Sequence, residues 1–183
     1  AKLGVSVLLL TRDIDGIARL SCNPAVGGVA KGNLVKEVDA LGGLIGRITD
    51  QSAIGYRFLN RSKGKAVWAS RAQVDKYIYP KTARAFLEQT KNITILQATV
   101  NDILVKSGKV YGVRTNFGQE FFTKSLVVCP GAFLKSTIHI GLTSFSGGRL
   151  SEGSSDALFA SIKKLGVALR HFKTGTCARL DKR

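Results

Sequence analysis

The longest apolar runs in the chain have the length of β-strands. Val5–Leu10 is almost continuously apolar and precedes Thr11-Arg12-Asp13, a pattern typical of a strand buried on both faces in a parallel sheet. A second run, Leu126–Val128, predicts another buried strand and leads to Gly131, where a backbone could approach a ligand closely. Both runs are far shorter than the roughly 20 residues needed to cross a bilayer, so no membrane segment is predicted.

Apolar residues at helical spacing mark three further segments. Asn33–Leu41 is the first, with Asn33 as its candidate N-cap. Ser70–Gln89 is the second, although Pro80 is expected to kink or split this helix at a cost of about 3 kcal/mol. The third predicted helix covers residues 157–165.

Residues 93–128 follow a different pattern, in which short apolar or alternating runs are separated by turn signals at Ser107-Gly108 and Asn116-Phe117-Gly118. This pattern predicts a small antiparallel meander. The expected strands are 93–96, 103–105, 110–115, 120–122 and 126–128. The order of elements is an α/β pattern interrupted by an antiparallel excursion, and it divides the chain into residues 1–92, 93–124 and 125–183.

The size of the chain, 183 residues of which 44% are hydrophobic, allows a sizeable core in one domain or in one domain with a small insertion. The chain contains no methionine and opens with Ala1-Lys2-Leu3-Gly4 directly before the first predicted strand. We therefore expect it to be an internal piece of a longer protein.

The charge of the chain is strongly basic, with 28 Lys and Arg against 12 Asp and Glu and a formal net charge of +16. Such an imbalance predicts a polyanionic partner, with nucleic acid first and an anionic membrane surface second. The alternative is a solvated basic surface without a specific partner. The excess is concentrated in residues 57–87, where Asp75 is the single acid. The basic residues of this segment are Arg57, Arg61, Lys63, Lys65, Arg71, Lys76, Lys81 and Arg84.

The three cysteines are widely spaced and form no CxxC pair, so they predict neither a disulfide framework nor a zinc site. This usage fits a reducing cytoplasm. The two histidines, His139 and His171, lie far apart in the sequence, and no serine lies in a nucleophile-elbow pattern. Metal-dependent and hydrolase chemistry therefore have no support, and no metal ligands are predicted.

A glycine-rich loop at residues 15–32 contains the run Ser21-Cys22-Asn23-Pro24-Ala25-Val26-Gly27-Gly28. It follows the first strand, and open α/β sheets bind their ligands at that end of a strand. Its backbone N–H groups could hold a phosphate or the polar edge of a flavin, and Cys22 could act as a nucleophile. The alternative is that Cys22 is a small buried hydrophobe and the glycines only make turns. No GxGxxG fingerprint occurs, and the acids nearest to the strand are Asp13 and Asp15.

Residues 21–43 closely resemble the stretch that marks the MnmG (GidA) family. Further motifs continue the resemblance, in order, over essentially the whole chain. They are Asp50-Gln51, Leu59–Gly64, Ala66-Val67-Trp68, Arg71-Ala72-Gln73, Val127–Leu134, Ile138–Gly141, Ser146–Arg149 and Lys173–Thr176. Chance agreement of so many spaced motifs is implausible.

The resemblance implies an α/β fold, namely a glutathione-reductase-like FAD-binding domain of Rossmann type. This domain would be truncated at its N-terminus, with residues 93–124 as an antiparallel β-meander insertion. It also implies an FAD-dependent enzyme that builds a carboxymethylaminomethyl group on C5 of the wobble uridine (U34) of tRNA. Its partners would be tRNA, an MnmE-type GTPase and a second copy in a homodimer, with NADH as reductant. The fragment alone is expected to be inactive.

The resemblance also assigns roles to individual residues. Cys22 matches a cysteine near the flavin and is the candidate catalytic thiol. The candidate FAD-binding residues are Asn23, Pro24, Gly27, Gly28, Val100, Gly131 and Ser155. Candidate tRNA phosphate contacts, with structural ion pairs as the alternative, are Arg61, Lys63, Lys65 and Arg71.

The chain departs from the family pattern at a few positions. Lys65 stands where the family usually has proline, and Cys177 follows Thr174-Gly175-Thr176 where proline is usual. Two other functions remain open: a small-molecule flavin oxidoreductase and a non-catalytic, basic RNA-binding remnant.

Overall fold

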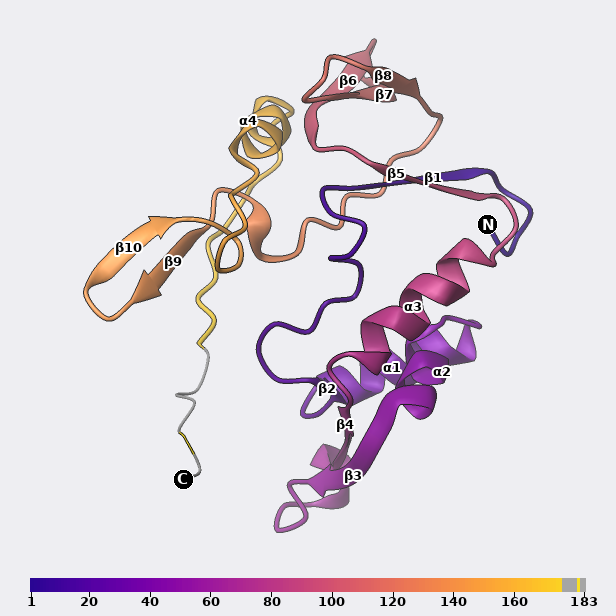
Figure 1. Ribbon diagram of the computed structural model, residues 1–183, viewed down its shortest axis with the longest axis vertical. Coiled ribbons are helices and arrows are strands. Elements are labelled where there is room, and N and C mark those ends of the chain that lie inside the picture. The colour runs from indigo at the N-terminus through magenta and orange to yellow at the C-terminus, as the bar shows by residue number, and fades with distance from the viewer. Residues whose placement is uncertain (176–180, 182–183) are drawn as a thin grey trace. The chain divides into compact units, whose positions relative to one another are not determined.

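A computed structural model of the chain describes residues 1–175 and 181 (Figure 1). The chain forms two compact units. Unit 1 contains Ala1–Leu9 and Asp13–Leu96 together with Gly175 and Asp181, and unit 2 contains Leu10–Arg12 and Gln97–Thr174. Each unit combines helices with strands, so the fold is mixed α/β.

Unit 1 is built on a three-stranded antiparallel sheet with the strand order β2-β4-β3. Its strands are β2 (Ala25–Gly27), β3 (Ala53–Leu59) and β4 (Ala69–Val74). Its helices are α1 (Lys31–Ala40), α2 (Ile45–Ser52) and α3 (Ile78–Glu88), and the short 3-10 helix η1 (Lys65–Val67) lies in the β3–β4 connection. A separate two-stranded sheet is formed by β1 (Val7–Thr11) and β5 (Ile93–Gln97), and the last residues of both strands belong to unit 2.

The core of unit 1 lies between one face of this sheet and the helices. Val26 on β2 stands opposite Ala72 on β4, and both are buried. Val74, two residues further along β4, is fully buried. Ile48 of α2 and Tyr79 of α3 complete the cluster from the helical side. Burying these apolar faces removes them from water, which holds the helices on the sheet.

Unit 2 contains a second antiparallel sheet, with the order β6-β7-β8, and one helix packed on it. Its elements are β6 (Val100–Lys106), β7 (Lys109–Thr115), β8 (Glu120–Phe122), the 3-10 helix η2 (Gly131–Phe133), the hairpin strands β9 (Thr137–Ile140) and β10 (Thr143–Ser146), and α4 (Asp156–Lys164). The amide of Ile103 on β6 donates to the hydroxyl of Ser161 on α4 at 2.9 Å. Leu104, Val113 and Ile162 are buried in this unit.

Several predicted elements are confirmed. The expected helix at 157–165 is α4, and the expected strands at 93–96, 110–115 and 120–122 are β5, β7 and β8. The strand at 103–105 lies within the longer β6. β5, however, pairs with β1 and takes no part in the three-stranded sheet of unit 2.

The predicted helix at Ser70–Gln89 is wrong in its first half. Residues Ala69–Val74 form β4, because pairing with strands on both sides overrides their local preference. The helix begins only at Ile78, so Pro80 is its third residue. Amides in the first turn have no partner within the helix, and Pro80 therefore neither kinks nor splits α3.

Three other expectations are also wrong. Helix α1 begins at Lys31 with Ala30 at its N-cap, so Asn33 lies inside the helix. Leu126–Val128 forms no strand, and Val127 is 83% exposed. The first strand is confirmed as β1, but the expectation that it is buried on both faces is wrong. Leu8 is 38% exposed, and β5 is the only strand that pairs with β1 among the described residues.

Candidate functional site

The glycine run Gly27-Gly28 lies against the carbonyl oxygen of Ser70 on β4. A Cβ atom built on Gly27 would stand 2.5 Å from that oxygen, and the φ angle of Gly27 is +88°. The amide of Gly28 donates to the same oxygen at 2.8 Å. The close approach and the positive φ angle of Gly27 both require glycine at position 27 for close packing of β2 on β4. The immediate role of this glycine is therefore structural, and a cofactor contact would be additional.

The residues before the glycines are arranged differently. Cys22 and Asn23 are exposed, so the interpretation of Cys22 as a buried hydrophobe is wrong. Pro24 is half-buried, and its carbonyl accepts the amide of Val74 at 2.8 Å, which anchors the segment to the end of β4. An exposed thiol next to an anchored backbone is accessible to a substrate or cofactor, as a nucleophile requires.

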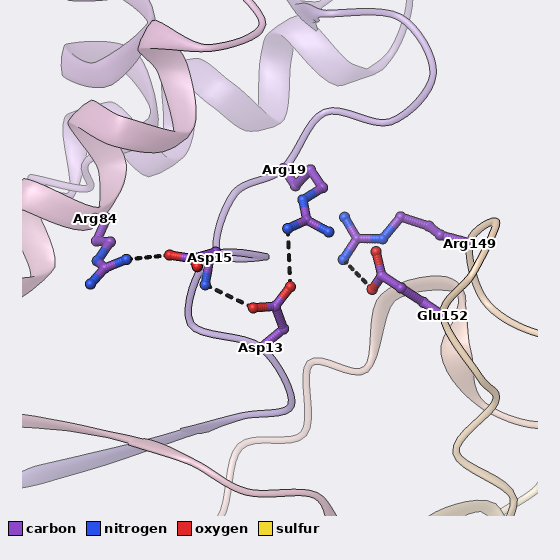
Figure 2. Close-up of polar contacts among 6 residues, drawn as sticks. All are labelled: Asp13, Asp15, Arg19, Arg84, Arg149 and Glu152. Carbon is purple, nitrogen blue, oxygen red and sulfur yellow. Dashed lines mark hydrogen bonds and ion pairs between the residues drawn. The ribbon is translucent and has the colours of Figure 1, made fainter.

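Asp13 and Asp15, the acids nearest to the first strand, are engaged within unit 1 (Figure 2). The carboxylate of Asp13 accepts from Arg19 at 3.0 Å and from the amide of Asp15 at 2.9 Å. The carboxylate of Asp15 pairs with Arg84 at 2.5 Å, and Arg84 also pairs with Glu88. The hydrogen bond to Glu88, the largest cause, and the charges of both carboxylates raise the pKa of Arg84.

Unit 2 holds the other candidate cofactor residues, Val100, Gly131 and Ser155. Val100 begins β6 opposite Thr115, and Gly131 opens η2 with a φ of +56°. The amide of Ser155 donates to the carbonyl of Phe133 at 2.7 Å, which joins the segment before α4 to η2. Gly131 and Ser155 are therefore connected through one local structure, whereas Val100 is on the sheet.

Arg12 is a member of this cluster that the sequence pattern did not identify. Its Nη1 donates to the carbonyl of Gly153 at 2.5 Å and lies 3.5 Å from the hydroxyl of Ser155. Its guanidinium also lies over the ring of Phe133, 5.3 Å from the centroid. A fixed guanidinium beside a serine hydroxyl fits an anionic group such as a nucleotide phosphate. The only signal in the sequence was a basic residue directly after the first strand.

The candidate RNA contacts Arg61, Lys63 and Lys65 lie in the connection between β3 and β4, and all three are exposed. Two hydrogen bonds order this connection: the amide of Lys63 donates to the carbonyl of Asn60, and the indole of Trp68 donates to the carbonyl of Lys63 at 3.1 Å. Among the described residues, no acid forms an ion pair with these three side chains or with Arg71. Their charges are thus available to an external anion.

The family model described as "Glucose inhibited division protein A" matches residues 1–183. The chain belongs to the GidA family. Among curated GidA-family proteins, it is 50% identical over 181 residues to the tRNA uridine 5-carboxymethylaminomethyl modification enzyme MnmG of Thermodesulfovibrio yellowstonii. That match covers 99% of the chain and 29% of the relative. The enzyme of the same name from Chlamydia trachomatis is also 50% identical, over 98% of the chain and 30% of the relative.

Solved structures of the GidA family agree with the fold. Aquifex aeolicus GidA matches with a TM-score of 0.87 and 46% identity, over 96% of the chain and 29% of that protein. The GidA-related protein of Thermus thermophilus matches in fold with a TM-score of 0.63 at 23% identity, over 90% of the chain and 60% of that protein. The chain thus spans about 30% of the length of the curated relatives it matches.

The described residues contain neither a candidate membrane span nor a candidate metal site. No helix there combines the length and the apolar character needed to cross a bilayer. No group of three or more His, Cys, Asp and Glu side chains in the same residues has an arrangement that could hold a metal ion.

Proposed function

We propose that this chain is part of an FAD-dependent enzyme that modifies C5 of the wobble uridine of tRNA, adding a carboxymethylaminomethyl group together with an MnmE-type GTPase. The observation that carries the proposal is the 50% identity, over 99% of the chain, to a relative named for that reaction. The net charge of +16 supports a nucleic acid substrate. A homodimer in the cytoplasm, with NADH as reductant, completes the proposal.

The finer fold in this proposal is a glutathione-reductase-like FAD-binding domain of Rossmann type. Residues 1–92 and 125–183 would belong to that domain, and residues 93–124 would be an antiparallel insertion. The three-stranded sheet formed by β6, β7 and β8 supports an insertion of this kind.

Within this proposal, individual residues have separate roles. Cys22 would supply a thiol to the substrate uridine, since its side chain is exposed. The residues that would contact FAD are Asn23, Pro24, Gly27, Gly28, Val100, Gly131 and Ser155. The guanidinium of Arg12 beside Ser155 would bind an anionic part of the nucleotide. When bound and reduced, FAD would supply the electrons needed to transfer a one-carbon unit from a methylenetetrahydrofolate donor to the uridine.

The tRNA would be held by cations of the β3–β4 connection. Arg61, Lys63 and Lys65 are exposed, and Arg71 is half-buried on β4. Contacts of this kind fix the position of an RNA backbone and make its binding depend steeply on salt.

Disruption of the gene that encodes the chain tests the proposal. Mass spectrometry of tRNA nucleosides from the disrupted strain is expected to show loss of the carboxymethylaminomethyl group from the wobble uridine. Expression of the gene in that strain should restore the modification, and a Cys22→Ser version should not. Unchanged nucleosides would favour a small-molecule flavin oxidoreductase or an RNA-binding remnant.

A further inference from the structure

Arg57 on β3 and Arg71 on β4 are directly opposite each other in the antiparallel sheet of unit 1. Directly opposite residues project from the same face, with Cβ atoms about 4.5–5.5 Å apart. On the far side of Arg71, the same row continues with Gly27 of β2, which has no side chain. The row Arg57–Arg71–Gly27 therefore places two arginines as neighbours on one face of the sheet, next to a residue without a side chain.

This arrangement has no compensating acid among the described residues. No ion pair involves Arg57 or Arg71 there. Asp75 is the single acid in residues 57–87, and its carboxylate accepts the amides of Tyr77 at 2.7 Å and Ile78 at 2.8 Å. It thereby caps the start of α3. Like charges directly opposite each other destabilise the pairing of two strands. An external anion bound between Arg57 and Arg71 would offset this repulsion.

The surroundings of the pair leave room for such an anion. Beside Arg57 on the same face is Gly55, and a Cβ atom built there would meet nothing within 4 Å. Arg71 is half-buried and Arg57 is exposed. Two planar donor groups together match the oxygens of a phosphate.

We propose that Arg57 and Arg71 together clamp one phosphate group of an RNA strand bound along the β3–β4 hairpin. This inference rests on the proposed tRNA function and adds Arg57, which that function did not assign. RNA is favoured over a flavin diphosphate because the cations continue along the hairpin to Arg61. β3 ends at Leu59, and Arg61 follows Asn60, whose φ is +60°, in the β3–β4 connection. An RNA strand carries a phosphate at every nucleotide and can meet cations at successive positions, whereas a flavin dinucleotide offers only two linked phosphates.

Fluorescence anisotropy of a labelled anticodon stem-loop RNA, titrated with the 183-residue chain at several salt concentrations, tests the clamp. Arg57→Gln and Arg71→Gln are each expected to weaken binding about 5- to 20-fold. The double variant should be no more than about twofold weaker than the weaker single variant, since both arginines hold the same phosphate. Its salt dependence should fall by about 0.7 in log K per log salt. Arg84→Gln, whose charge is already paired with Asp15 and Glu88, is the matched control and should bind within about twofold of wild type.

The conservative variants Arg57→Lys and Arg71→Lys separate a clamp from simple charge. They should keep the salt dependence but recover only part of the affinity, because an ammonium lacks the two-donor fork. Thermal melting identifies any glutamine variant that has lost its fold. In that case, the RNA affinity of the lysine variants is compared with that of wild type instead.

Five results would overturn the clamp. Four concern RNA: binding by the variants equal to wild type, single losses that multiply in the double variant, full affinity in the lysine variants, and absence of RNA binding by the wild-type chain. The fifth is loss of FAD affinity with unchanged RNA affinity, which would assign the pair to the cofactor. None of these results decides the proposed function, which the nucleoside analysis of the disrupted strain tests separately.

Discussion

Replacing Gly27 by alanine tests whether the close approach of β2 to β4 is required for the fold of unit 1. The new methyl group would lie 2.5 Å from the carbonyl oxygen of Ser70, which is backbone and cannot rotate away. The φ angle of +88° adds strain for any residue with a side chain. Two separate penalties therefore act at this one position.

The magnitude follows from these two penalties. A side chain in the left-handed backbone region costs about 1–2 kcal/mol, and forcing an extra methyl into a packed site costs about 1–3 kcal/mol. We expect Gly27→Ala to lower the free energy of unfolding by the sum, about 2–5 kcal/mol. Gly42→Ala is the matched control, because Gly42 has a φ of +77° but its Cβ position meets nothing within 4 Å. The control should lose only the backbone part, about 1–2 kcal/mol.

Urea unfolding of both variants and wild type, followed by tryptophan fluorescence, measures the difference. Trp68 is the single tryptophan and precedes β4, so its emission reports on unit 1. With a urea dependence of about 2 kcal/mol per molar, the midpoint of Gly27→Ala should fall by about 1–2.5 M, and that of Gly42→Ala by about 0.5–1 M. Equal losses in the two variants would refute the close approach of Gly27 to Ser70 as the cause.

Three other predictions address α3 and the exposed thiols. Hydrogen bonds from the amides of Ile78 and Tyr77 lower the pKa of Asp75, so its stabilisation is present above the unfolded pKa and is lost as the pH falls through the folded pKa. Urea midpoints of wild type should therefore fall more steeply than those of Asp75→Asn below about pH 4, and parallel curves would contradict this. Pro80→Ala should change the free energy of unfolding by less than about 1 kcal/mol, whereas Ala83→Pro, inside the same helix, should cost about 3 kcal/mol or more in the same urea assay. Cys22 and Cys129 should both react with a thiol reagent in the native chain, as peptide mapping would show. Only Cys22→Ser, and not Cys129→Ser, should abolish tRNA modification in the disrupted strain. A Cys22→Ser variant that still modifies tRNA would exclude this thiol from catalysis.

Local patterns were sufficient where an element depends on its own residues. Helix α4 follows from its apolar spacing and from Gly166, whose φ is +78° just beyond the helix end. Strands β7 and β8 follow from alternation and from the turn between them, where Gly118 has a φ of +79°. β4 could not be found in this way, because its residues also fit a helix and only its pairing with β2 and β3 makes them a strand.

For the candidate site too, the sequence indicated the local motifs but not the contacts between distant residues. The motif at Ser21–Gly28, together with the motifs that follow it, was enough to indicate the family, because those residue types at those spacings are specific. Neither the motif nor its spacing could indicate that Arg12 lies beside Ser155, since 143 residues separate them in the chain.

The sequence alone thus determined the family, the basic segment at 57–87, and the helices and turns set by local periodicity and glycine. Only the tertiary structure decided that Gly27 lies against Ser70, that Cys22 is exposed, and that Arg57 faces Arg71. The physical reason is that strand pairing and burial depend on contacts between distant residues. Such contacts exist only after the chain has folded, and neither the hydrophobic pattern nor local propensity specifies which distant residues will meet.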